Sequence, residues 1–147
     1  MPILALSFAT AMLASAPATT CQGDTTVEMN ACAAAALEAE EAILARYASA
    51  ARQRLRQSVK DIGAADQGPV EALKGFEAAE IAWRSYRDAD CGAVYAYWFS
   101  GTIRNLKAID CRIYQTRVHA HALWRQWLTY ADSTPPVLPE PQLPNGE

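Results

Sequence analysis

The 147-residue sequence lacks an excess of basic residues, since 13 Lys and Arg stand against 16 Asp and Glu, a net charge of −3. A nucleic-acid partner is therefore not expected, because nucleic-acid-binding domains carry a basic face. The G-x-S-x-G, H-E-x-x-H, P-loop and dinucleotide-binding glycine motifs are also absent. The two histidines, His119 and His121, would point about 200° apart on a helix, which does not suit a shared metal. Carboxylate pairs such as Glu40 and Glu41 are expected on a solvated helix face. The sequence therefore predicts neither an enzyme nor a cofactor or metal site.

Strand patterning is also missing, because no run of useful length alternates between polar and apolar residues. Residues 19–133 are instead rich in Ala, Glu and Arg, which favour helices. Apolar residues recur there at spacings of three, four and seven in three stripes, which run from Leu37 to Ile62, from Leu73 to Trp98 and from Leu106 to Trp127. The predicted fold is all-α, one domain of three long antiparallel helices.

Turn and cap signals separate these helices. Thr25 or Thr26 can cap the first helix, and Glu28 is placed to complete a capping box. Gly63 to Pro69 ends that helix and begins the next, since proline suits a first turn. A break at Ser100-Gly101-Thr102 leaves the Thr102 hydroxyl available to cap the third helix.

Four cysteines without C-x-x-C spacing predict two disulfides in an exported protein. Cys91 and Cys111 flank the break at residues 100–102 at similar distances, each about 14 Å from the hairpin tip. Antiparallel packing therefore places them side by side, within disulfide range. Cys21 precedes the first helix and Cys32 lies about two turns into it, so the preceding segment can fold back. We expect disulfides Cys21–Cys32 and Cys91–Cys111 rather than a zinc site, whose ligand spacing the sequence lacks.

The two ends of the chain differ in composition from the helical part. Residues 1–18 contain an uncharged apolar run that ends in Ala16-Pro17-Ala18, the pattern of a signal peptide cleaved after Ala18. A buried N-terminal helix is the alternative; the run is too short for a membrane span, and the residues before Cys21 do not form a lipobox. Residues 134–147 hold five of the eight prolines, which predicts a disordered, proline-rich tail. We therefore expect a periplasmic or secreted protein with no membrane span in the mature chain.

Charged residues interrupt the apolar stripe of the second helix. Arg87 lies on that face and needs a partner, because an unpaired buried charge costs several kcal/mol. Glu80, Asp88 and Asp110 are the candidate partners, and such an ion pair would fix the helix register. The functional alternative is a recognition patch, since Trp, Tyr and Arg are enriched at binding hot spots. That candidate patch consists of Glu80, Trp83, Tyr86, Arg87 and Asp88.

Several segments carry a family resemblance. They are Thr25 to Cys32, the W-x-x-Y-R-D-x-x-C block from Trp83 to Cys91, Gly101-Thr102-Ile103, Cys111, and Thr116 to Leu123. Together they resemble the LprI-type family of lysozyme inhibitors, which are small exported bacterial proteins, over residues 21 to 128. The resemblance implies a disulfide-bonded helical module. The sequence departs from the family pattern at Ala45, Glu80 and His119, where Asn, Gln and Arg are usual.

The resemblance implies a protein partner, lysozyme, bound stoichiometrically by an exported helical binding protein. Animal lysozymes are basic, so the net charge of −3 is consistent with faster association. The alternative function is a structural or interaction module of the cell envelope without inhibitory activity. In that case the proline-rich tail would serve as a spacer or docking segment.

Overall fold

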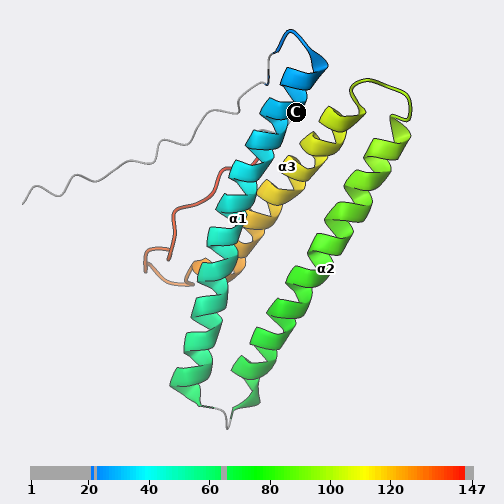
Figure 1. Cartoon of the computed structure of the whole chain (residues 1–147). Coiled ribbons are helices and arrows are strands. Elements are labelled where there is room, and N and C mark those ends of the chain that lie inside the picture. Colours follow the sequence, from blue (N-terminus) through cyan, green and yellow to red (C-terminus); the bar gives the residue numbers. More distant parts are fainter. Residues whose placement is uncertain (1–20, 22, 64–65, 145–147) are drawn as a thin grey trace, which may run out of the picture.

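A computed structural model of the chain describes residues 21, 23–63 and 66–144. It contains helices α1 (Thr26–Ile62), α2 (Gln67–Tyr97) and α3 (Arg104–Leu123), followed by the short π-helical segment η1 (Trp124–Leu128). Figure 1 shows that consecutive helices run in opposite directions and that the C-terminal segment returns along the bundle toward the start of α1. The described residues form no strand, so the prediction of an all-α fold with three long helices is confirmed. The expected signal peptide, residues 1–18, lies outside the described residues.

Local signals fix the two ends of α1. The Thr25 hydroxyl accepts a hydrogen bond from the Glu28 backbone N–H at 3.2 Å, and the Glu28 carboxylate accepts one from the Thr25 N–H at 3.0 Å. This reciprocal pair is the predicted capping box. Gly63 follows the last turn with φ +86°, a left-handed conformation that favours glycine. The boundaries of α1 therefore follow from residues next to each end.

The other two helices begin differently. Asp66 caps α2, because its carboxylate accepts a hydrogen bond from the Gly68 N–H at 2.9 Å. The N-cap residue of α3 is Ile103, which makes no side-chain capping bond, so the predicted Thr102 cap is wrong. Backbone hydrogen bonds hold the α2–α3 turn instead, including one from the Gly101 N–H to the Trp98 carbonyl at 2.7 Å.

The hydrophobic core lies where α1, α2, α3 and η1 meet. Its buried members are Leu44, Tyr47, Ala48, Ala51, Leu55, Phe76, Ala120, Leu123 and Leu128. Two residues assigned to the apolar stripes are exposed, namely Ile62 and Trp98. Ile62 is the last residue of α1, and Trp98 directly follows the last residue of α2. The stripes therefore contain most of the buried core residues but not all of them.

Both predicted disulfides are present, each with a Cα–Cα distance of 5.6 Å. Cys21–Cys32 ties the segment before α1 to an early turn of that helix, whereas Cys91–Cys111 joins α2 to α3. Cys91 is fully buried. The second disulfide therefore fixes the position of one helix relative to another.

Part of the proline-rich tail packs against the bundle. The Tyr47 hydroxyl of α1 donates a hydrogen bond to the Pro139 carbonyl at 2.7 Å. The Trp124 indole N–H of η1 donates one to the Leu138 carbonyl at 2.9 Å, and the Leu138 side chain contacts the core. Proline removes backbone donors but leaves carbonyl acceptors, and side chains of the bundle supply the donors. The expectation of a disordered tail is therefore corrected for these residues.

A Tyr47→Phe variant is expected to lose about 1 kcal/mol of unfolding free energy, because the ring stays buried and only the bond to Pro139 is removed. Burial raises the pKa of Tyr47 above its ordinary value of 10.0. The stabilisation is therefore complete below the unfolded-state pKa and is lost as pH rises through the higher folded-state pKa. Urea unfolding of both proteins at neutral and alkaline pH measures the difference. An unchanged difference at alkaline pH would contradict this reading of the hydrogen bond.

Candidate functional site

A set of polar side chains connects the three helices between the hydrophobic core and the Cys91–Cys111 disulfide. We refer to it as the interhelical network. Its members are Glu40 and Glu41 of α1, Glu80, Trp83, Arg87 and Asp88 of α2, and Thr116, Arg117 and His119 of α3. It includes four of the five residues of the predicted recognition patch.

Glu80 and His119 form a pair within the buried part of the network. The Glu80 side chain is buried, with the residue 4% exposed, and its Oε1 lies 2.7 Å from Nε2 of His119. The Trp83 ring stacks on the imidazole with a centroid distance of 4.0 Å and an interplanar angle of 7°. The other carboxylate oxygen, Oε2, is buried and has no hydrogen-bond partner in the described part of the chain. His119 is therefore the polar group that compensates the burial of this carboxyl group.

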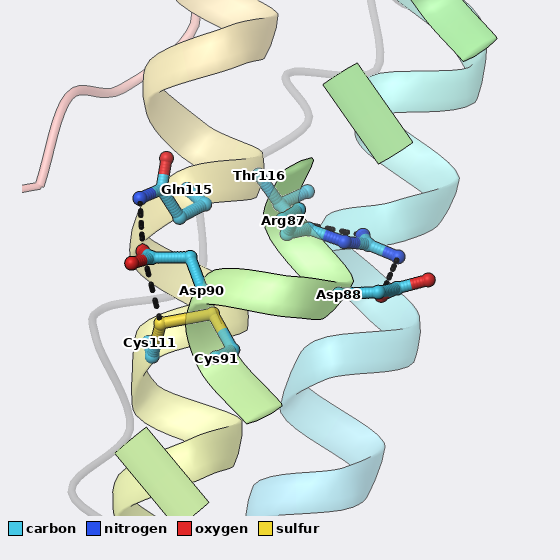
Figure 2. Close-up of a disulfide and its surroundings, with 7 residues drawn as sticks. All are labelled: Arg87, Asp88, Asp90, Cys91, Cys111, Gln115 and Thr116. Carbon is cyan, nitrogen blue, oxygen red and sulfur yellow. Dashed lines mark hydrogen bonds and ion pairs between the residues drawn. A yellow bond between two sulfur atoms is a disulfide. The ribbon is translucent and has the colours of Figure 1, made fainter. Parts of the chain in front are cut away.

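The Arg87 guanidinium contacts all three helices. Its Nη1 donates to Glu41 Oε1 of α1 at 2.9 Å and to Thr116 Oγ1 of α3 at 3.2 Å. Its Nη2 lies 3.5 Å from the carboxylate of Asp88, and Figure 2 shows Asp88 beside the end of the Arg87 side chain. The guanidinium carbon lies 5.1 Å from the centroid of the Trp83 ring. With its side chain only 12% exposed, Arg87 acts as a charged connector between helices.

The predicted partners of Arg87 are confirmed only in part. Asp88 is one of its partners, but the shorter ion pair is with Glu41 of α1, which the sequence did not single out for this role. Glu80 pairs with His119 of α3 instead, and Asp110 of α3 is exposed. The prediction missed Glu41 because the contact depends on how α1 packs against α2.

The α1 carboxylates Glu40 and Glu41 form the solvated face expected from the sequence only in part, because Glu41 is exposed and Glu40 is not. Glu40 accepts a hydrogen bond from Arg117 Nη2 at 2.7 Å and is mostly buried. Glu41 accepts one from Arg87. Because consecutive residues on a helix point about 100° apart, the two carboxylates reach different neighbours, α3 and α2. The expectation of a solvated pair is therefore wrong for Glu40, whereas Glu41 stays half-exposed beside Arg87.

The predicted recognition patch divides into an inner and an outer part. Glu80, Trp83 and Arg87 are held by contacts inside the bundle. Tyr86 and Asp88 have exposed side chains. A partner protein can therefore reach Tyr86 and Asp88 directly, whereas the inner three residues determine how the helices are positioned.

A second group of polar side chains lies beside the disulfide on the α3 side of α2. Gln115 Nε2 donates to Asp90 Oδ2 at 3.0 Å, and the same oxygen lies 3.9 Å from Cys111 Sγ (Figure 2). Asp90, Cys91 and Cys111 are close enough together to resemble a metal-ligand set. However, both sulfurs belong to one disulfide and offer no thiolate ligand. This cluster therefore supports the helix pairing rather than a metal site.

The two histidines have different neighbours. His119 pairs with Glu80 of α2, whereas His121 Nε2 lies 2.9 Å from Glu140 Oε1 of the C-terminal segment. An imidazole paired with a carboxylate can act as a general base. Within the described residues, neither histidine is hydrogen-bonded to a hydroxyl or thiol nucleophile. His119 thus connects α3 to α2, and His121 connects α3 to the C-terminal segment.

A shallow cavity of about 400 Å³ lies on the outer face of α1. Its lining is polar and comprises Ser49, Arg52, Gln53, Arg56, Gln57 and Lys60. Arg52 Nε donates to Glu77 Oε1 at 2.7 Å, and this contact holds the pKa of the Glu77 carboxyl below its ordinary value. Because Arg52 is already paired with Glu77, the cavity is a weaker candidate site than the interhelical network.

Comparison with known proteins adds a finding that agrees with this geometry. A model of the protein family described as Lysozyme inhibitor LprI matches residues 18–123, more than half of the chain. The matched stretch contains all three helices and the whole interhelical network. No curated protein and no solved structure matches the chain. Glu80 and His119, two of the positions where a departure from the family pattern is expected from the sequence, contact each other in the structure.

Proposed function

The chain belongs to the LprI lysozyme-inhibitor family, and from this premise we propose that it is an exported protein that inhibits lysozyme by binding it stoichiometrically. The family match over residues 18–123 is the observation that carries the proposal. Inhibition by binding requires a rigid surface and no catalytic group. The disulfide between α2 and α3 and the interhelical network support such rigidity.

We propose the periplasm or the extracellular space as the location. The two disulfides support it, because such bonds persist in oxidising compartments. Cleavage of residues 1–18 as a signal peptide is part of this proposal, and the intact mass of the exported protein tests it. Among the described residues, no helix combines the length and the hydropathy that a membrane span requires.

We propose the exposed edge of the interhelical network as the contact surface for lysozyme. This edge comprises the exposed carboxylate of Asp88 and the half-exposed carboxylate of Glu41. Carboxylates favour a basic target, because opposite charges across an interface attract each other. Ion pairs with Arg87 hold both carboxylates in place. Fixed side chains lose less conformational freedom on binding, which favours affinity.

Clearing of bacterial cell walls by lysozyme tests the inhibitory function. We expect clearing to slow as the purified protein is added and to stop changing at a fixed molar ratio, as stoichiometric binding requires. Lysozymes of several types are needed, because the target type is not specified by the family match. Unchanged clearing at several-fold molar excess would exclude inhibition and favour the envelope interaction module without inhibitory activity.

An Asp88→Asn variant tests the contact surface. We expect the Kd for a basic lysozyme to rise about fivefold, mainly through slower association, and the effect to shrink at high salt. Glu71→Gln is the matched control, since it removes the same charge from an exposed carboxylate at the other end of α2. Binding kinetics at two salt concentrations measure both variants. Equal effects of the two variants would show that net charge alone, and not the proposed edge, controls association.

A further inference from the structure

The turn between α2 and α3 exposes a cluster of large apolar side chains, which we name the aromatic tip. Its members are Tyr95, Tyr97, Trp98, Phe99 and Ile103. Tyr97 is 85% exposed and Phe99 is 79% exposed. Figure 1 shows this turn at the end of the bundle opposite the α1–α2 turn. Contiguous exposed apolar side chains of this kind mark interaction sites on folded proteins.

The backbone of the aromatic tip is strained at Phe99, which is a second indication that this turn has a function. Phe99 has φ +29°, in the left-handed region that favours glycine and costs stability for other residues. The Phe99 N–H donates to the Ala96 carbonyl at 3.1 Å, and Arg104 Nη1 donates to the Phe99 carbonyl at 2.8 Å. The exposed ring adds nothing to the core. The chain therefore carries an aromatic residue where glycine would give a more stable turn.

The charged residues within the segment that forms the tip are both positive. Residues 92–109 contain Arg104 and Lys107 but no Asp or Glu, although the whole chain has a net charge of −3. The Arg104 guanidinium lies 4.9 Å from the centroid of the Tyr95 ring, and Lys107 Nζ lies 5.7 Å from that of Trp98. Cationic groups thus lie directly beside exposed aromatic rings.

We propose that the aromatic tip binds the surface of an anionic phospholipid bilayer. Trp and Tyr side chains favour the interface between lipid and water, and exposed apolar groups enter the boundary between headgroups and acyl chains. Arg104 and Lys107 attract anionic headgroups. The same positive charges disfavour a basic lysozyme. The tip is therefore a different surface from the exposed edge of the interhelical network, and this inference does not depend on the proposed function.

Co-sedimentation of the exported full chain with lipid vesicles tests the proposal. We expect binding to vesicles of mixed phosphatidylglycerol and phosphatidylcholine, weaker binding at high salt, and little binding to phosphatidylcholine alone. Phe99→Gly is the most informative variant, because it removes the ring and relieves the strained backbone. Its thermal stability should equal or exceed that of the wild type, while its partition onto anionic vesicles falls about tenfold. Lys107→Gln should lower that partition about fivefold.

A double variant, Ile81→Ser with Tyr114→Ser, is the matched control. It removes exposed apolar side chains from α2 and α3 away from the tip, and its partition should equal that of the wild type. The wild type and all variants carry the same N-terminal residues, so a difference in vesicle binding between them arises at the substituted positions. Failure to bind anionic vesicles, or equal binding by Phe99→Gly and wild type, would overturn the proposal. So would a Phe99→Gly variant that loses lysozyme binding and keeps full vesicle binding, because the tip would then be a protein contact.

Discussion

Replacement of His119 by alanine is expected to lower the unfolding free energy by about 3–5 kcal/mol. The imidazole is the polar neighbour of Glu80 Oε1, and Glu80 Oε2 already lacks a partner within the described residues. The variant therefore leaves a carboxyl group inside the bundle without compensation. Trp83 also loses the ring on which it stacks. Urea unfolding followed by circular dichroism measures the change.

The matched control for this prediction replaces both partners, as Glu80→Met with His119→Leu. Apolar side chains of similar volume in place of a buried ion pair are often neutral or stabilising. We therefore expect the double variant to recover most of the stability that His119→Ala loses. The unfolding free energies of Glu80→Met, His119→Leu and the double variant together give the coupling energy between the two positions. A His119→Ala variant within about 0.5 kcal/mol of wild type would show that the buried pair is unimportant for stability.

Loss of the Cys91–Cys111 disulfide is the second change with a large expected effect. The bond closes a loop with a sequence separation of 20, and chain entropy predicts a loss of about 3 kcal/mol for Cys91→Ala with Cys111→Ala. Cys91 is fully buried, so the smaller alanine also leaves a cavity, which adds to the loss. Thermal unfolding without reductant measures the effect.

The control for this prediction is the other disulfide, removed as Cys21→Ala with Cys32→Ala. That bond joins a segment before α1 to the same helix, with a sequence separation of 11. Its loss frees one end of α1 and leaves the contacts between helices intact. We therefore expect a smaller drop in melting temperature than for the Cys91 and Cys111 pair. Equal drops would show that the link between α2 and α3 has no special role in the bundle.

The sequence predicted the helices, the capping box and the disulfide pairing because each depends on residues close together in the chain. Thr25 and Glu28 are three residues apart, and the apolar stripes follow from helical spacing alone. The stripes failed at Ile62 and Trp98, because helical spacing shows which face is apolar but not how far along the helix that face is covered. Local signals therefore predicted the fold class and the boundaries of α1.

The interhelical network could be predicted only in outline. Trp83 and Arg87 were identifiable because a charge interrupts an apolar stripe. The partner Glu41 lies 46 residues from Arg87, and its role depends on the packing of α1 against α2. The contact of Leu138 with the core likewise depends on a donor from another segment, the indole N–H of Trp124. No pattern within a single segment carries that information.

The disulfide connectivity has a consequence for how the protein is made. Each bond joins cysteines that are neighbours in chain order, Cys21 with Cys32 and Cys91 with Cys111. A chain oxidised while it crosses a membrane with its N-terminus first would present Cys21 and Cys32 together before Cys91 emerges. Each native pair then forms from the first two thiols available, and the crossed pairings require a later cysteine to reach back. Such a chain reaches its native connectivity by simple sequential oxidation, without a disulfide isomerase to reshuffle its bonds.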